Sequence, residues 1–176
     1  MPIPEKTPVS GGDIKSETSV LRLIYPQWQG GIVDHWMPDL LPEDASKGYF
    51  LGAQLLKILA PESTAMTAEV PVSLDIRDRA VEKGISARRV IMKQTGAALD
   101  IVRENAPEKI VTLGGECSVS VVPFTYLVAK YPDDVAIVWL DAHPDVNLPY
   151  DEYKGYHAMA LTACLGMGDG EIMRML

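Results

Sequence analysis

The apolar run from residue 135 to 140, with the polar residues after it, constrains the fold of this chain most. Val135 to Leu140 is short and rich in β-branched residues, and the turn sequence Tyr131-Pro132-Asp133-Asp134 precedes it, so a buried parallel strand is predicted. Asp141, His143 and Asp145 follow at alternate positions. In extended backbone, alternate side chains point to the same side. The three are therefore expected to converge beyond the strand's carboxyl end, where open α/β sheets bind ligands.

Carboxylate and imidazole groups together form a ligand set that suits manganese, zinc or iron. Asp141, His143 and Asp145 therefore predict a divalent metal site. The alternative is a polar exit from a strand with a coincidental histidine, because Asp and His are common in loops. Three metal-capable side chains in strict alternation after a buried strand favour the metal site.

Strand and helix patterns alternate along the chain. Strands are predicted at 20–25, 69–72, 109–113 and 135–140, and helices at 43–60, 87–105, 118–130, 157–165 and from 169 onward. This order is typical of an α/β fold with three α/β/α layers and a mainly parallel, doubly wound sheet. Residues 1–17, rich in Pro and Gly, are expected to form a loose arm before a single domain over residues 18–176.

Local signals refine this order at three positions. Pro71 places the second strand at a sheet edge, because proline has no N–H to donate to a neighbouring strand. Ser86 is expected to cap the helix that follows it. Arg88 and Arg89, at the start of that helix, are expected on a solvated face.

Composition excludes several classes of partner and site. The 176 residues carry a formal net charge of −8 and no basic run, which argues against nucleic-acid binding. The first residues lack the apolar core of a signal peptide, and no apolar stretch is long enough to cross a bilayer, so no membrane partner is expected. The two cysteines are too few for a disulfide framework, which favours a reduced, cytoplasmic setting.

A second loop is expected to face the same crevice as the metal triplet. The predicted strand at 109–113 runs into Gly114-Gly115-Glu116-Cys117-Ser118, and in a parallel sheet its end is expected beside that of the strand at 135–140. The glycines allow a sharp turn and a close approach, which brings Glu116 or Cys117 near the triplet. The alternatives are a tight turn without a ligand and a cysteine that simply packs as a small apolar side chain.

These segments resemble the arginase and agmatinase family of ureohydrolases. The family pattern is Gly-Gly-Asp-His-Ser, then Asp-Ala-His-x-Asp after the next strand, then a catalytic His about a dozen residues on. Gly114-Gly115-Glu116-Cys117-Ser118 is similar to the first motif, Asp141-Ala142-His143-Pro144-Asp145 matches the second in full, and His157 stands at the third. The resemblance extends from about residue 18 onward.

The resemblance implies a metal-dependent hydrolase that cleaves the C–N bond of a linear amidine or guanidino compound, arginine- or agmatine-like. Family enzymes hold two manganese ions that share a bridging hydroxide, which attacks the guanidinium carbon. By resemblance, Asp141 bridges both metals, His143 and Asp145 each ligate one, and Cys117 stands at a ligand position. His157 resembles the catalytic proton shuttle. Asn147 resembles a residue that binds the substrate carboxylate.

Two departures from the family pattern keep alternatives open. Cys117 replaces the usual His, and a thiolate favours Zn²⁺ or Fe²⁺ over Mn²⁺. The carboxyl-terminal half of the family fold, with its further metal-binding aspartates, has no counterpart here, so the resemblance covers an amino-terminal half whose exposed sheet edge predicts a homo-oligomer. A catalytically inactive arginase-like subunit or regulator is the first alternative. A deacetylase related by fold is the second.

Overall fold

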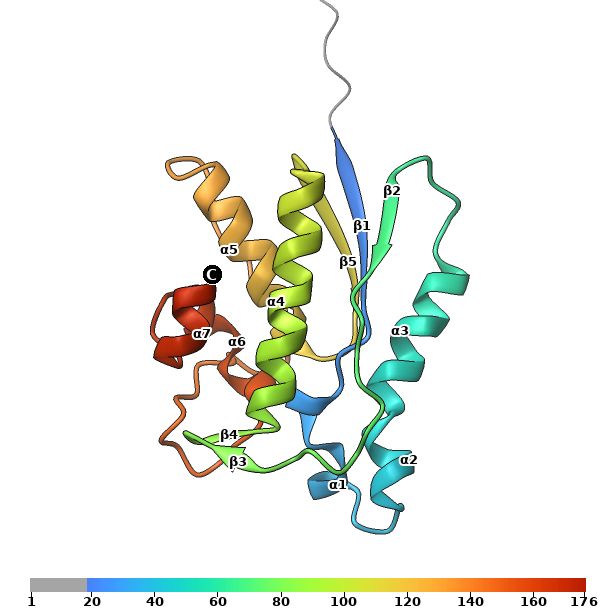
Figure 1. Ribbon diagram of the computed structural model, residues 1–176, viewed down its shortest axis with the longest axis vertical. Coiled ribbons are helices and arrows are strands. Elements are labelled where there is room, and N and C mark those ends of the chain that lie inside the picture. The colour runs from blue at the N-terminus through green and yellow to red at the C-terminus, as the bar shows by residue number, and fades with distance from the viewer. Residues whose placement is uncertain (1–18) are drawn as a thin grey trace, which may run out of the picture.

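The computed structural model describes residues 19–176 and has the predicted three layers. Figure 1 shows a small sheet with helix α4 (Arg88–Asn105) on one side and helix α3 (Gly48–Leu59) on the other. The arm predicted for residues 1–17 lies outside the described residues. The three-layer α/β fold with a parallel sheet is therefore confirmed.

The main sheet has three parallel strands in the order β2-β1-β5. Strand β1 (Val20–Tyr25) lies in the centre, with β5 (Lys109–Gly114) on one side and β2 (Met66–Glu69) on the other. The edge position predicted for the second strand is confirmed. The strand lies earlier than expected, because it ends before Pro71, which has no N–H for the ladder.

One face of β1 packs against α4 and forms a hydrophobic core. Leu21, Leu23 and Tyr25 alternate along the strand and are all buried, because side chains two apart in a strand share a face. They meet Leu99 and Val102, whose spacing of three keeps both on one side of the helix. Helix α3 contacts β1 and β5 from the opposite face, which completes the layers.

The strand predicted at 135–140 is not formed. These residues have no regular structure, and Val138 and Leu140 are 75% and 92% exposed. A strand needs a neighbour for its backbone N–H and C=O groups, and no described strand pairs with this segment. The prediction that it would lie beside β5 was wrong for the same reason, since β5 is an edge of the described sheet.

The start of α4 also differs from its prediction. Ser86 does not cap the helix: it belongs to the short strand β4 (Ile85–Ser86), and its hydroxyl donates to the Arg79 carbonyl. Ala87, in the left-handed region, occupies the cap position instead. Arg88 is buried rather than solvated, because Asp169 and Glu171 both accept hydrogen bonds from its guanidinium group. Arg89 is exposed, as predicted.

The remaining elements are short. The helix predicted at 43–60 is divided at Lys47 into α2 (Pro42–Ser46) and α3. Strands β3 (Val81–Glu82) and β4 form a small antiparallel hairpin. The other helices are α1 (Val33–Trp36), α5 (Val121–Lys130), α6 (Ala160–Cys164) and α7 (Gly170–Met175), with 3-10 turns η1 (Gln29–Gly31), η2 (Cys117–Ser120) and η3 (Tyr156–Met159). Across residues 19–176, no helix is both long enough and apolar enough to cross a bilayer.

Candidate metal centre

A cavity of about 810 Å³ is lined by all six residues for which the sequence predicts a metal-binding, catalytic or substrate-binding role. It is lined by residues from η1, α1, α3, η2, the loop after residue 140 and η3: Gly31, Val33, Trp36, Met37, Tyr49, Cys117, Asp141, His143, Pro144, Asp145, Asn147, Tyr153, His157 and Ala158. The loops after β5 and after residue 140 thus meet at one cavity although the segments before them do not pair.

The loop after β5 is held against the exit of β1 by a close backbone contact. The Gly115 N–H donates to the Tyr25 carbonyl at 2.9 Å, and the Glu116 N–H donates to the Gln27 carbonyl at 3.1 Å. A Cβ on Gly115 would lie 1.8 Å from the Gln27 oxygen, so only glycine fits there. This contact fixes the position at which Cys117, two residues after Gly115, enters the cavity.

Glu116 is a buried carboxylate that organises the loop from inside. It accepts hydrogen bonds from Gln27 Nε2 at 2.7 Å and from the Ser118 N–H and hydroxyl, each at 2.8 Å. Burial raises the pKa of Glu116, and these donors partly oppose the rise. Gln94 of α4 donates to Gln27 Oε1 at 2.8 Å. The network therefore joins the exit of β1, helix α4 and the Cys117 loop.

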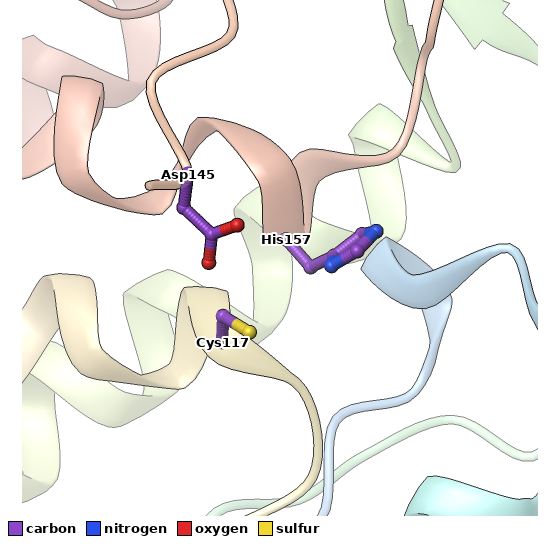
Figure 2. A group of neighbouring side chains, drawn as sticks. All are labelled: Cys117, Asp145 and His157. Carbon is purple, nitrogen blue, oxygen red and sulfur yellow. The ribbon is translucent and has the colours of Figure 1, made fainter. Parts of the chain in front are cut away.

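Cys117, Asp145 and His157 form the tightest group of potential ligands among residues 19–176. One donor atom from each lies within 4.8 Å of the other two, and Figure 2 shows the three side chains gathered from separate segments. Asp145 is only 3% exposed, and its Oδ2 has no hydrogen-bond partner. A buried carboxylate oxygen without a donor is costly unless a cation or proton neutralises it.

The backbone of Asp145 explains how its side chain reaches this group. Its φ of 49° lies in the left-handed region, and its carbonyl accepts hydrogen bonds from the N–H groups of Leu161 and Thr162 in α6. Burial raises the pKa of Asp145, and the charge of Asp141 adds to the rise. Asp145 is thus placed by α6 rather than by an extended strand.

The Cys117 thiol lies between two carboxylates. It donates to Asp141 Oδ2 at 3.4 Å. Burial raises the pKa of the thiol strongly, and the neighbouring Asp145 and Asp141 raise it further. Without a cation the sulfur therefore stays protonated, whereas a bound cation would favour the thiolate.

His157 is held by an aromatic cluster that includes Tyr153 and Trp36. Its Nε2 lies 2.8 Å from the Tyr153 hydroxyl, which also contacts the Gly31 carbonyl at 3.1 Å and the Trp36 indole nitrogen at 3.3 Å. Burial raises the pKa of Tyr153, so this hydroxyl keeps its proton at neutral pH. The contact with Tyr153 therefore occupies Nε2 of the imidazole, and Nδ1 is the ring nitrogen that remains available to bind another group.

Asp141 and His143 line the cavity but do not belong to the tight group. Residues 141–143 form bends, so the extended geometry expected for the alternating triplet is not present. The Asp141 carboxylate accepts from the His143 N–H at 2.9 Å, a contact that lowers the pKa of Asp141. The His143 side chain is 79% exposed. Asn147 is half-buried, and its N–H donates to the Ala158 carbonyl at 2.8 Å.

Sequence reasoning missed Tyr153 and Gln27, which position His157 and Glu116. Tyr153 carried a weak signal, since it stands four residues before a candidate histidine, but the segment between them is not helical. Gln27 carried none, because its role depends on a contact 89 residues away in the sequence.

Comparisons with known proteins identify the family of this chain. The sequence model of the arginase family matches residues 56–173, which include Cys117, Asp141, His143, Asp145 and His157. The chain belongs to the arginase family. It is 30% identical over 117 residues to "Arginase 2, chloroplastic/mitochondrial" of Arabidopsis thaliana, a match that covers 66% of this chain and 31% of that protein. It is 30% identical over 66 residues to the arginase of Staphylococcus aureus strain COL, covering 37% of this chain and 22% of that protein.

Solved arginase structures share the fold. The Entamoeba histolytica arginase, crystallised with L-ornithine, superposes with a TM-score of 0.60 at 18% identity, over 89% of this chain and 52% of that one. The Bacillus subtilis arginase superposes with a TM-score of 0.52 at 17% identity, over 90% and 51%. The arginase-family chain therefore spans about half the length of these relatives.

Proposed function

We propose that this chain supplies catalytic residues of a metal-dependent hydrolase that cleaves the C–N bond of a linear amidine or guanidino compound, arginine- or agmatine-like. Membership of the arginase family supports the hydrolase class. The observation that carries the proposal is the convergence of acidic, thiol and imidazole groups from one loop and two 3-10 turns on a single cavity. A cavity of this size is large enough for a small guanidino molecule.

The residues of the cavity fit a divalent metal ion. The partnerless Asp145 Oδ2 needs a positive neighbour, the Cys117 sulfur belongs to the same group of donor atoms, and the Asp141 carboxylate contacts that sulfur. Together with His143, they are the residues that would hold metal. Resemblance to the family favours Mn²⁺, while the thiol favours Zn²⁺ or Fe²⁺. A divalent ion bound there supplies Lewis-acid chemistry and activates water near neutral pH.

The other residues act on protons and on the substrate. His157, hydrogen-bonded to Tyr153, is placed to transfer a proton to the departing amine, which is the task of a general acid. Asn147 lines the same cavity and can hydrogen-bond a polar head group of the substrate. Asp141 Oδ2 accepts a hydrogen bond from the Cys117 thiol, and Asp141 Oδ1 accepts one from the His143 N–H, so this carboxylate joins two of the proposed metal-binding positions.

A catalytically inactive subunit or regulator is the second candidate. It is favoured by the exposure of the His143 side chain and by the small number of carboxylates around the cavity. Two carboxylates do not neutralise two divalent ions. The edge of β5 and the apolar residues 135–140 also offer a surface for a partner, so we propose a homo-oligomer. The two free cysteines support the proposal of a reduced, cytoplasmic setting. Native mass spectrometry tests the oligomer, and a strictly monomeric mass would contradict it.

The enzymatic proposal is tested by product release from a panel of guanidino compounds. After incubation with Mn²⁺ or Zn²⁺, the chain is expected to release urea or ammonia from at least one compound. The Asp145→Asn variant should abolish that release, while Asp133→Asn, an exposed turn residue, should retain it. Tightly bound metal without any product would favour the inactive subunit instead.

A further inference from the structure

The three tightly grouped ligands come from different parts of the chain, and one donor atom of each lies within 4.8 Å of the other two. Cys117 begins η2, Asp145 lies in the loop before residue 147, and His157 lies in η3 (Figure 2). The buried, partnerless Asp145 Oδ2 is independent of this grouping and indicates that a cation belongs there. His143, the histidine that the family resemblance places on a metal, lies in solvent instead.

The hydrogen bonds of Tyr153 determine which nitrogen of His157 is available to bind a metal ion. A tyrosine hydroxyl has one proton to donate and two lone pairs to accept. Its proton goes to the Gly31 carbonyl, and the Trp36 indole N–H donates to its oxygen, so His157 Nε2 must be the protonated nitrogen that donates to it. Nδ1 therefore carries the lone pair. Histidines that bind metals commonly donate their other ring N–H in this way.

The donor chemistry selects one class of metal. A thiolate is a soft ligand suited to zinc, whereas manganese is best held by carboxylate, carbonyl and water oxygens. One sulfur, one nitrogen and one carboxylate oxygen form a typical zinc ligand set. We propose that Cys117 Sγ, Asp145 Oδ2 and His157 Nδ1 bind a single thiophilic divalent ion of the zinc class, with its fourth position open to the cavity.

The geometry needs little adjustment. A tetrahedral zinc ion separates its ligand atoms by about 3.5 Å, given bonds of roughly 2.0 to 2.3 Å. The three donor atoms already lie within 4.8 Å of one another, so side-chain movements of about an ångström close the site. Three protein ligands and one open position are the pattern of zinc sites that bind water or substrate, and the cavity lies next to this position.

This inference deepens the proposed function and rests on it for the use of the ion, but not for its binding. It changes one role: in a single-ion site His157 is a ligand, and the proton has to leave by another group. The two roles are separable. A proton carrier can be removed without loss of the ion, whereas a ligand cannot.

Cobalt(II) titration of the metal-free chain tests the site without turnover. Co²⁺ substitutes for Zn²⁺ and produces a thiolate-to-cobalt charge-transfer absorption in the near ultraviolet when a cysteine binds it. The expected result is one Co²⁺ per chain with this band, displaced by equimolar Zn²⁺ but not by equimolar Mn²⁺. The Cys117→Ser variant should lose the band, and Cys164→Ser, the matched change at the other cysteine, should keep it.

Histidine variants distinguish this site from the arrangement implied by the family. His157→Gln is expected to weaken the first Co²⁺ by more than about 100-fold, because the loss of a residue that only orients a ligand already costs about tenfold or more. His143→Gln should weaken the first ion far less than His157→Gln does, because the exposed His143 side chain lies outside the tight group. Cys117→His is a control for the case in which the Cys117→Ser variant fails to fold. It should still bind one ion, without the thiolate-to-cobalt band and with a higher Mn²⁺ affinity than the wild type.

Two outcomes would overturn the inference: wild-type chain that binds Co²⁺ without the thiolate band, or His143→Gln losing the ion while His157→Gln retains it. These results are distinguishable from failure of the proposed function. If the chain shows the cobalt spectrum but releases no product from guanidino compounds, the metal site is supported and the proposed activity is contradicted. If the chain hydrolyses a guanidino compound with Mn²⁺ but shows no cobalt spectrum, the proposed activity is supported and the single-ion site is contradicted.

Discussion

Strand β1 and residues 135–140 have similar sequences and opposite surroundings. Both are six-residue runs of mostly aliphatic side chains with one aromatic residue. β1 is paired on both edges and covered on both faces, and Leu23 is fully buried. Residues 135–140 pair with no described strand, and Leu140 is almost fully exposed. The apolar composition of a segment thus shows that it favours burial. Whether the segment becomes a buried strand depends on a neighbouring strand with which it can pair.

The same substitution in the two segments should have very different costs. Leu23→Ala removes a fully buried side chain from the central strand and is expected to lower the free energy of unfolding by about 3 kcal/mol. Leu140→Ala, at an exposed position, should change it by less than about 0.5 kcal/mol. Urea unfolding followed by circular dichroism measures both. Equal costs would mean that residues 135–140 are buried in solution, by a second copy or another partner.

Acid should weaken the packed region through a contact that residues 135–140 lack. Arg88 of α4 binds Asp169 at the start of α7, with an Nη2–Oδ1 distance of 2.7 Å. Burial raises the pKa of Asp169, but the hydrogen bonds from Arg88 and the α7 backbone outweigh it and leave the pKa below its ordinary value. The stabilisation is therefore complete above about pH 4 and is lost as the pH falls through the lowered pKa.

Asp169→Asn isolates this contact. It should cost about 2 kcal/mol at pH 7, less than the loss of an entire buried ion pair because Glu171 still binds Arg88. Below pH 4 its unfolding free energy should fall less steeply than that of the wild type. Asp133→Asn is the control and should follow the wild-type curve. Parallel curves for Asp169→Asn and wild type would show that the pair does not titrate as described.

Trp139 is one of the residues through which the segment 135–140 contacts the packed region. Its ring meets Phe124 of α5 edge to face, with centroids 6.1 Å apart. Trp139→Ala is expected to cost about 1 kcal/mol, since only part of the indole is buried, whereas Val138→Ala should cost almost nothing. The same urea titrations test this. A larger effect at Val138 than at Trp139 would show that the segment packs with its opposite face toward the packed region.

Amide hydrogen exchange gives the finest comparison. The amides of β1 should exchange only on global unfolding, because their ladder bonds lie between two strands. Those of residues 135–140 should exchange through local openings that cost about 1 kcal/mol or less. Protection of both segments to the same degree would show that residues 135–140 have a pairing partner in solution.

The sequence predicted the parts of the fold that depend on local pattern. The bounds of β1 and α4 follow from apolar periodicity, and both were predicted within a residue. The failures involve partners distant in the sequence. The burial of Arg88 depends on Asp169, 81 residues away, and residues 135–140 depend on strands that no local pattern identifies. At the cavity, the motif residues were predicted, but the left-handed turn at Asp145 and the role of Tyr153 were not.

Metal content tests the central claim, that the group around Asp145 binds a divalent cation. The measurement is elemental analysis of the chain after equilibrium dialysis against Zn²⁺ and removal of loosely held metal. The expected result is one zinc per chain for the wild type and for Asp133→Asn, and nearly none for Asp145→Asn, because the buried carboxylate is then a neutral amide. Wild-type chain without zinc, or Asp145→Asn with undiminished zinc, would contradict the account.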